Sequence, residues 1–243
     1  MSRGVAVVTG GAGGIGQAVL ARLARDEFTP VSWDLSTEAP AARLALRTDV
    51  TDLSSLTDAA ARTINEAGPI RALVVNAGIL GPVARAWEAD PAEIRRVIEV
   101  NLVSAFLTAH AVVPHMLCND PGRADRPDRG RIVVMSSVQA KEGTALAGPY
   151  AASKAGLIAL AKTLGKELAI EGIAVNAVTP TVVRTAMEQS ITEERRADLL
   201  AKIPMGRFIE PDEVAALVGW LCGPDCSFST GAVFDLSGGR STY

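Results

Sequence analysis

The feature that most constrains the fold is a run of glycines between a short apolar strand and a helical pattern near the start of the chain. Residues 5–9 read Val-Ala-Val-Val-Thr, a β-branched run typical of a buried strand, and residues 15–27 carry apolar side chains at helical spacing. Between them stand Gly10-Gly-Ala-Gly-Gly-Ile-Gly16. A turn this tight needs residues without a Cβ, so that the backbone can approach a pyrophosphate and the helix can direct its first N–H groups at it. The glycine loop therefore predicts a dinucleotide site.

Two glycine patterns fit this loop. Gly-x-Gly-x-x-Gly is satisfied through Gly11, Gly13 and Gly16, whereas Thr-Gly-x-x-x-Gly-x-Gly is satisfied through Thr9, Gly10, Gly14 and Gly16. Both place glycine where a helix opens after a strand, and the local pattern alone does not choose between them.

Short β-branched runs and longer helical patterns alternate along the rest of the chain. This order predicts an α/β fold, a doubly wound parallel sheet of about seven strands with helices on both faces, formed as a single domain over residues 1–243. Strands are expected at residues 5–9, 30–33, 44–48, 72–75, 131–136, 173–178 and 232–236, and helices at 15–27, 53–67, 91–117 (one or two helices), 149–171 and 211–222. The polar segment 119–130 is expected to be a surface excursion rather than a linker.

Composition excludes several classes of protein and partner. The formal net charge of -3 lacks the basic excess of a nucleic-acid-binding protein. Three cysteines do not make a secreted disulfide framework, and with two histidines the chain offers no metal-ligand set, so we expect a cytoplasmic protein without a metal. The uncharged stretch 100–119 has the length of a membrane span, but its polar side chains indicate a buried helix and no membrane partner.

An acidic residue follows the second strand. Asp34 lies 18 residues beyond Gly16, where a carboxylate can accept hydrogen bonds from an adenosine ribose. The same carboxylate would repel a 2'-phosphate, and no Lys or Arg occurs at 10–17 or 34–37 to bind one. The alternative role for Asp34 is a helix cap or a solvated turn. The pattern favours NAD over NADP.

A tyrosine and a lysine stand one helical turn apart. Tyr150 and Lys154 are spaced i and i+4, so their side chains share one face of the expected helix, and a neighbouring cation should lower the pKa of the phenol towards use as a base. Ser137 ends a strand at the sheet edge where ligands bind in parallel α/β folds, and its hydroxyl could hold a substrate oxygen. The spacing alone is weak, because an exposed amphipathic helix face can carry the same pair.

Together these residues resemble the short-chain dehydrogenase/reductase family over essentially the whole chain. The glycine loop resembles the family's cofactor loop, Asp49-Val50 its adenine contact, Asn76-Ala77-Gly78 its central-strand motif, and Asn101, Ser137, Tyr150 and Lys154 its catalytic set. The resemblance implies a Rossmann fold, with a cofactor site formed by Gly10, Gly13, Gly14, Ile15, Gly16, Asp34, Asp49, Val50, Asn76, Ala77, Gly78, Tyr150, Lys154, Pro180, Val183 and Thr185.

The resemblance also implies roles for the catalytic residues. Tyr150 would be the general acid/base, Ser137 would orient the reacting oxygen, Lys154 would bind the nicotinamide ribose, and Asn101 would anchor a water in a proton relay. Two residues depart from the family pattern: Val75 replaces an asparagine, and Thr181 replaces the glycine that usually follows Pro180. The second departure puts the geometry of that loop in question.

Family members are typically homotetramers joined through the helices corresponding to 104–117 and 151–169, although the same apolar faces could be intramolecular core. For the substrate site we expect Ser137, Gln139 and Tyr150, under a lid near 186–204. If strand geometry persists beyond Ser137, the amide of Gln139 lies beside the reacting oxygen, which suits a polar substrate.

Three functions are compatible with these patterns. The leading hypothesis is an NAD-dependent dehydrogenase that interconverts a small secondary alcohol and a ketone, with a hydroxy acid, sugar acid or polyol as substrate. The first alternative is a 3-oxoacyl-thioester reductase of the same family, which normally uses NADPH. The second is an NAD-binding scaffold without turnover, because a fold does not dictate a function.

Overall fold

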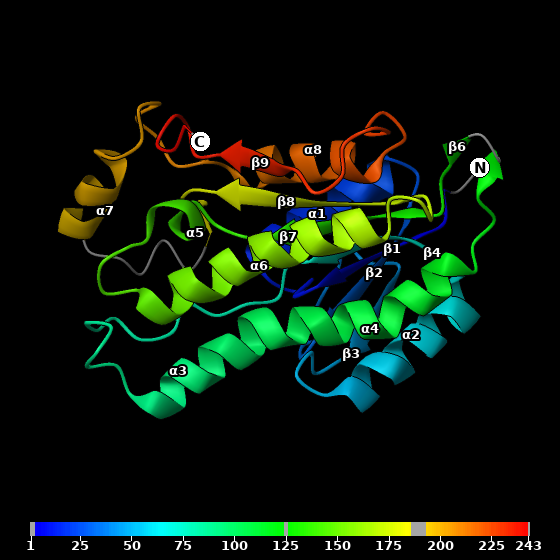
Figure 1. Cartoon of the computed structure of the whole chain (residues 1–243), viewed down its shortest axis with the longest axis horizontal. Helices are drawn as coiled ribbons and strands as arrows, with labels where there is room; N and C mark the ends of the chain where they lie inside the picture. Colours follow the sequence, from blue (N-terminus) through cyan, green and yellow to red (C-terminus); the bar gives the residue numbers. More distant parts are fainter. Residues whose placement is uncertain (1–2, 124–125, 186–192, 243) are drawn as a thin grey trace.

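The computed structural model describes residues 3–123, 126–185 and 193–242 of the chain. Seven strands form one parallel sheet in the order β3-β2-β1-β4-β7-β8-β9 (Figure 1). The strands are β1 (Val5–Thr9), β2 (Thr29–Asp34), β3 (Leu44–Arg47), β4 (Ile70–Val75), β7 (Gly130–Met135), β8 (Ile173–Pro180) and β9 (Val233–Leu236). The order reverses between β1 and β4, as in a doubly wound Rossmann fold.

Helices cover both faces of this sheet. One face carries α1 (Gly14–Arg25) and α8 (Pro211–Cys222), with Val19 and Val214 fully buried between them and the strands. The other carries α2 (Leu53–Ala67), α4 (Ser104–Leu117) and α6 (Gly148–Glu167), which bury Leu56, Val112 and Leu157. The central strands are mainly apolar because helices exclude water from both sides. The predicted fold class and strand number are confirmed.

Four short elements lie outside the predicted pattern. They are β5 (Gly122–Arg123) and β6 (Arg126–Pro127), which pair in the 119–130 excursion, α5 (Gln139–Glu142) and α7 (Glu193–Leu200). Each is too short or too polar to show a hydrophobic period.

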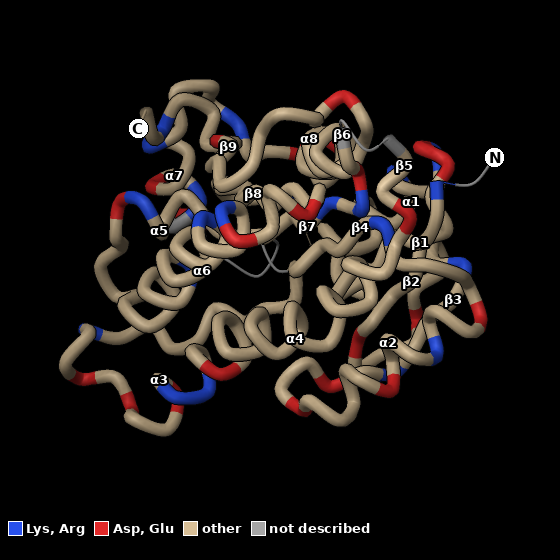
Figure 2. The backbone as a smooth tube through the Cα atoms, turned by 45° about the vertical axis from the view of Figure 1, so that its right-hand side comes forward, with Lys and Arg blue, Asp and Glu red and all other residues tan. Residues whose placement is uncertain are grey.

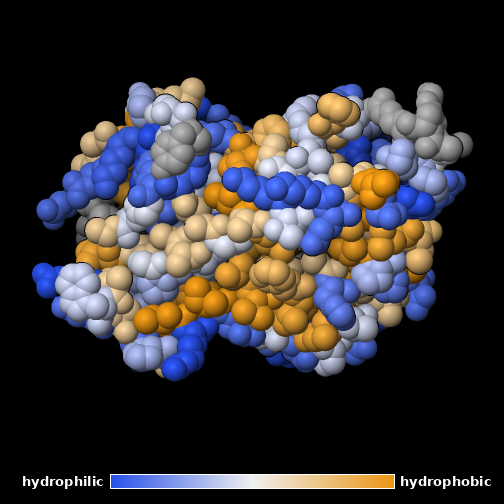
Figure 3. All heavy atoms as spheres, viewed as in Figure 1, coloured by the Kyte–Doolittle hydropathy of each residue, from blue (hydrophilic) through white to orange (hydrophobic). Residues whose placement is uncertain are grey.

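The apolar stretch expected to form one or two helices is a single helical run. It comprises α3 (Pro91–Ile98), a π turn η1 (Glu99–Val103) and α4, and by length and composition it could cross a membrane. Instead it packs on the sheet through β4 and lies between α2 and α6. Figure 2 shows that α4 carries no charged residue, and Figure 3 shows an apolar band where it meets the surface. It is a core helix with one outward apolar face.

Candidate active site

The glycine loop joins β1 to α1 at the carboxyl edge of the sheet. Gly10 has a φ of +66°, which favours glycine, and a Cβ at Gly16 would collide with the Gly10 carbonyl oxygen. A Cβ at Gly14 would lie 3.0 Å from Cγ2 of Thr185, so the segment after β8 closes against the loop. The glycines leave the backbone uncovered at the amino end of α1, which fits a pyrophosphate.

Two side chains fasten the loop to the neighbouring strand β4. The Thr9 hydroxyl accepts hydrogen bonds from the backbone N–H groups of Asn76 and Ala77 at 3.0 and 3.1 Å. The Asn76 amide donates to the carbonyl oxygens of Thr9 and Gly10, both at 3.1 Å. Asn76 therefore holds the loop in shape, whereas Val75, the departure from the family pattern, is simply buried in the core.

Asp34 lies at the end of β2 facing the glycine loop. Its carboxylate accepts hydrogen bonds from the backbone N–H groups of Ala12 in the loop and of Ser36, both at 3.0 Å. The carboxylate is thus held at the position where a ribose would lie over the loop.

The Asp49 and Val50 pair lies at the same edge after β3. Asp49 accepts hydrogen bonds from the backbone and hydroxyl of Thr51 at 2.9 and 2.7 Å, which lowers the pKa of its carboxyl. The Val50 side chain is 9% exposed and belongs to the core. The groups of this pair that could contact an adenine are therefore the backbone and the second carboxylate oxygen of Asp49.

Ser137, Tyr150 and Lys154 come together between β7 and α6. The Ser137 and Tyr150 hydroxyls are hydrogen-bonded, and the Lys154 ammonium lies 5.7 Å from the centre of the Tyr150 ring. Lys154 is 5% exposed, and its Nζ donates to the Met135 carbonyl at 2.8 Å. The predicted proximity of these three side chains is present in the structure.

The acidity of this pair departs from the expectation. Burial raises the pKa of Tyr150, and its hydrogen bond with Ser137 offsets only part of that rise. Burial also lowers the pKa of Lys154 to about 8. The predicted lowering of the phenol pKa by Lys154 is therefore wrong for the protein alone, because desolvation outweighs the neighbouring cation.

Asn101 occupies the π turn beside these residues. Its side chain accepts from the Ile79 N–H at 2.8 Å and donates to the Ile79 carbonyl and the Ser153 hydroxyl at 2.9 and 3.0 Å. A Cβ at Gly78 would lie 3.1 Å from Asn101 Oδ1 and 3.4 Å from Lys154 Nζ, so Gly78 leaves room between them. The Asn101 amide thus joins the segment after β4 to α6, and its side-chain bonds go to protein groups.

The segment after β8 completes this edge. Pro180 ends the strand, Val183 forms a bridge with Ile209, and Thr185 approaches Gly14 as described. Thr181 donates its N–H to the Leu236 carbonyl at 3.1 Å and does not have a positive φ. Position 181 therefore does not need a glycine, and the replacement of glycine by Thr181 does not strain the backbone of this loop.

Gln139 does not continue a strand after Ser137. The strand β7 ends at Met135, and Gln139 begins the short helix α5 with its N–H donating to the Ser137 hydroxyl at 3.2 Å. The prediction that strand geometry places the Gln139 and Ser137 side chains on the same side of the sheet was therefore wrong. The Gln139 Oε1 atom is nevertheless buried, and no described residue donates a hydrogen bond to it.

Part of the expected lid, residues 186–192, lies outside the described residues. The described part forms α7 and returns through Ile203, which is 3% exposed. There the chain contacts the carboxyl-terminal segment, because Met205 donates its N–H to the Gly238 carbonyl at 3.1 Å.

Ion pairs that the sequence patterns did not reveal fasten α5 to the carboxyl-terminal part of the chain. Lys141 pairs with Asp235 at 3.2 Å, and Glu142 pairs with Arg240 at 2.7 Å. Partners 94 and 98 residues apart leave no local signal. The same C-terminal segment contacts Met205, so one segment braces both α5 and the base of α7.

Comparison with known proteins agrees with this geometry. The family model for short chain dehydrogenases matches residues 4–196. The chain is 38% identical to a 2-dehydro-3-deoxy-L-rhamnonate dehydrogenase (NAD(+)) of Sphingomonas sp., over 98% of this chain and 95% of that protein. It is 36% identical to a 3-oxoacyl-[acyl-carrier-protein] reductase of Thermotoga maritima, over 97% and 96%.

A solved structure shares the whole architecture. A 3-ketoacyl-(acyl-carrier-protein) reductase from Brucella melitensis, complexed with NADH, superposes with a TM-score of 0.90 at 28% identity and covers 99% of each chain. With the family model spanning most of the sequence, the chain belongs to the short-chain dehydrogenase/reductase family of NAD(P)-dependent oxidoreductases.

Proposed function

We propose that this enzyme is an NAD-dependent dehydrogenase that interconverts a small polar secondary alcohol (a hydroxy acid, sugar acid or polyol) and its ketone. The observation that carries the substrate class is the buried amide oxygen of Gln139, a residue whose backbone N–H donates to the Ser137 hydroxyl; no described residue donates to that amide oxygen. A buried acceptor without a donor costs about 1–3 kcal/mol, and a substrate hydroxyl would supply the missing donor. The similarity to a dehydrogenase named for a deoxy-sugar acid supports the same class.

The glycine loop and the residues around it fit a dinucleotide. Gly10, Gly13, Gly14, Ile15 and Gly16 would surround the pyrophosphate, Asp34 the adenosine ribose, and Asp49-Val50 the adenine. Lys154, Asn76-Ala77-Gly78 and the segment Pro180, Val183 and Thr185 would hold the nicotinamide half. When bound, the cofactor supplies the hydride acceptor and donor. The carboxylate of Asp34 beside the loop supports NAD over NADP.

The proton of the reaction would move through Tyr150. The Tyr150 oxygen accepts the proton of the substrate alcohol as a phenolate during oxidation and returns it as a hydroxyl during reduction, while the Ser137 hydroxyl holds the same substrate oxygen. Lys154 would bind the nicotinamide ribose, and because its ammonium lies 5.7 Å from the centre of the Tyr150 ring, a phenolate formed there gains a nearby cation. Asn101 would hold a relay water through its backbone in the π turn, because its amide is already bonded to protein groups.

A 3-oxoacyl-thioester reductase is the second candidate. The relative from Thermotoga maritima is similar over nearly the full length of both proteins. Two features argue against this activity. Asp34 would repel the 2'-phosphate of NADPH, the cofactor that such reductases normally use. The net charge of -3 is unfavourable as well, because a carrier protein is itself acidic and docks on basic residues.

The experiment is an assay of the purified protein with NAD and a panel of alcohols. Hydroxy acids, deoxy-sugar acids and polyols should give a higher kcat/KM than hydrophobic secondary alcohols and β-hydroxyacyl thioesters. Gln139→Leu, which keeps the side-chain size but removes the amide, should lower kcat/KM for polar substrates about tenfold and leave apolar alcohols unaffected. A preference for thioesters, or an unchanged preference in Gln139→Leu, contradicts the proposed substrate class.

Tyr150→Phe tests the proton-transfer role in the same assay. The variant keeps the ring but loses the hydroxyl, so turnover should fall about 10²-fold or more while NAD binding, followed by fluorescence titration, survives. Retention of most of the activity contradicts the assignment of Tyr150.

We also expect a homotetramer joined through α4 and α6, in the cytoplasm, with a small molecule as partner rather than nucleic acid or membrane. The exposed side chain of Phe106 on α4 supports an interface there, and free cysteines support a reducing compartment. Residues 193–204, the described part of the expected lid, would border the substrate site.

A further inference from the structure

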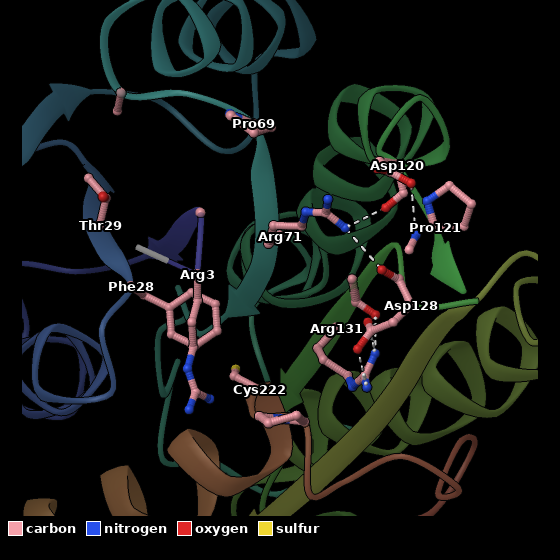
Figure 4. A pocket seen from close by; sticks show the side chains of 15 residues that line it. Arg3, Phe28, Thr29, Pro69, Arg71, Asp120, Pro121, Asp128, Arg131 and Cys222 are labelled. Carbon is pink, nitrogen blue, oxygen red and sulfur yellow. Dashed lines mark hydrogen bonds and ion pairs between the residues drawn. The ribbon is translucent and has the colours of Figure 1, made fainter. Parts of the chain in front are cut away.

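A large groove lies at the edge of the sheet opposite the candidate active site. It has a volume of about 960 Å³ and is lined where strands begin, by Gly4 before β1, Thr29 in β2, Pro69 before β4 and Gly130 in β7 (Figure 4). Ser137, Tyr150 and the glycine loop lie at the other ends of these strands. The volume is within the range of about 300–1,000 Å³ that small-molecule sites occupy.

Three arginines face this groove from separate parts of the chain. Arg3 is exposed, and no described residue accepts a hydrogen bond from its guanidinium. Arg71 donates through Nη1 to the Asp120 and Asp128 carbonyls, both at 2.9 Å, and no carboxylate of the described residues pairs with it. Both cations therefore keep donors for another partner.

The third arginine is part of the wall. The Arg131 side chain is 8% exposed, and it donates to both carboxylate oxygens of Asp128 at 2.6 and 3.1 Å and to the Cys226 carbonyl at 3.2 Å. In this pair the charges of Arg131 and Asp128 cancel. Figure 4 shows the Arg131 and Arg71 side chains on one side of the groove and the Arg3 side chain on the other.

The charges that face the groove favour an anion. Arg131 and Asp128 cancel as a pair, which leaves Arg3, Arg71 and the carboxylate of Asp120, a net charge of +1; Asp120 accepts from the Gly122 N–H at 2.8 Å. A locally positive groove in a chain of net charge -3 attracts anions to one place. Guanidinium groups match the oxygens of carboxylates and phosphates in shape.

The remaining lining is mostly apolar, with Thr29 as the one uncharged polar side chain among the described residues that line the groove. The ring of Phe28 and the thiol of Cys222 stand next to Arg3, and proline rings at Pro69, Pro121 and Pro224 complete the wall. Burial raises the pKa of Cys222 to about 12, so its thiol is neutral and adds no negative charge. Phe28 is 7% exposed and Cys222 4% exposed, so the apolar surface that remains open is mainly that of the proline rings. An inorganic ion would leave these rings in water, whereas an aromatic or aliphatic body would cover them.

We propose that this groove is a second binding site, separate from the active site, for a small organic oxyanion in which a phosphate or carboxylate is carried on an apolar body. The oxyanion lies between Arg3 and Arg71, and the apolar body lies against the proline rings of the wall. The site is independent of the oxidoreductase reaction, because it lies across the sheet from the active-site residues.

Calorimetric titration of the full-length protein tests this site, using phenyl phosphate as the probe, a phosphate-free buffer and saturating NADH to occupy the active site. We expect one site per chain with a dissociation constant below about 1 mM. Benzoate should bind to the same site if the carboxylate suffices, and inorganic phosphate or phenol alone should bind at least tenfold more weakly.

The key variant is Arg3→Glu, which removes no hydrogen bond to a described residue and should leave the melting temperature unchanged. We expect it to weaken phenyl phosphate binding at least tenfold. Arg96→Glu, which changes the net charge equally at an exposed position on α3, is the matched control and should bind as the wild type does. Should Arg3→Glu prove unstable, Arg3→Gln replaces it.

Any of four results overturns the proposal. The first is no binding of phenyl phosphate up to about 10 mM, which corresponds to less than about 3 kcal/mol. The second is equal binding by Arg3→Glu and wild type, and the third is equal affinity for phenol and phenyl phosphate, which would exclude an anion site. The fourth is loss of binding when NADH is present, which would place the probe in the active site instead.

Discussion

Lys154 and Tyr150 lie side by side, and burial moves their pKa values in opposite directions. The phenol becomes harder to deprotonate and the ammonium becomes easier to deprotonate, because both charged forms lose water. The spacing in the sequence correctly predicted that the two side chains lie close together. It took into account only the effect of the lysine cation on the pKa of the phenol, and not the effect of burial. The loss of solvent depends on the strands and helices that surround the pair, which spacing alone does not show.

The buried lysine predicts a pH dependence of stability. In the folded protein the pKa of Lys154 falls to about 8 from its ordinary 10.5, so between these pH values the unfolded chain binds more protons and the free energy of unfolding rises with pH. Lys154→Met removes the contribution of this lysine to the pH dependence of the free energy of unfolding. The difference in free energy of unfolding, wild type minus variant, should increase from pH 7.5 to pH 9.5.

Urea unfolding of the cofactor-free protein measures this difference, and the range stays below the pH at which Tyr150 titrates. A difference that stays flat or falls with pH would mean that Lys154 is neutral or well solvated in the folded state.

Asp34 predicts the choice of cofactor. With a carboxylate beside the glycine loop and no nearby cation at 10–17 or 34–37, kcat/KM should favour NAD over NADP at least tenfold, about 1.4 kcal/mol. Asp34→Asn keeps an acceptor for the Ala12 N–H but removes the charge, and it should narrow the preference. Equal efficiency of the wild type with both cofactors would contradict the role of Asp34.

At the scale of elements, the glycine loop was predictable because its constraints are local. Gly16 is needed because a Cβ there would collide with the Gly10 carbonyl, whereas a Cβ at Gly13 would lie 3.5 Å from the same oxygen, an ordinary contact. Gly13 also has an extended backbone, with a φ of -74° that any residue can adopt.

The two glycines therefore predict different results for the same substitution. Gly16→Ala should destabilise the protein by about 1–3 kcal/mol, the range for overpacking, and Gly13→Ala should change the free energy of unfolding by less than about 0.5 kcal/mol. Chemical denaturation of both variants measures this. Equal loss of stability would mean that the loop as a whole, rather than the contact of Gly16 with Gly10, requires glycine.

The helical run from Pro91 to Leu117 was predictable in extent but not in detail. Its apolar composition and the proline at its first position indicate the helix, whereas the π turn at Asn101 follows from hydrogen bonds to Ile79 and Ser153 on other elements. Gln139 was misplaced for a related reason. After β7 the chain turns into α5, where the Ala140 N–H donates to the Ser137 carbonyl at 3.0 Å, and the alternation of residues does not mark that turn.

For the whole molecule, the outward face of α4 predicts self-association. Phe106 is 53% exposed on a helix without charged residues. Contact with a second copy of the chain would remove this apolar surface from water and so favour association. Phe106→Glu should convert the expected tetramer into a smaller species, as measured by light scattering after gel filtration. Phe228→Glu, at a fully exposed position outside α4 and α6, is the control. An unchanged mass for Phe106→Glu would exclude α4 from the interface.

The sequence by itself determined the order of strands and helices, the glycine loop, and the positions of Asp34, Ser137, Tyr150 and Lys154 along it. These follow from periods and spacings within short segments, since a parallel α/β chain brings the ends of its strands to one edge. Tertiary structure decided which contacts these residues make and how burial changes their pKa values. It also formed the groove of Arg3, Arg71 and Arg131, because only packing brings segments so distant in the chain together.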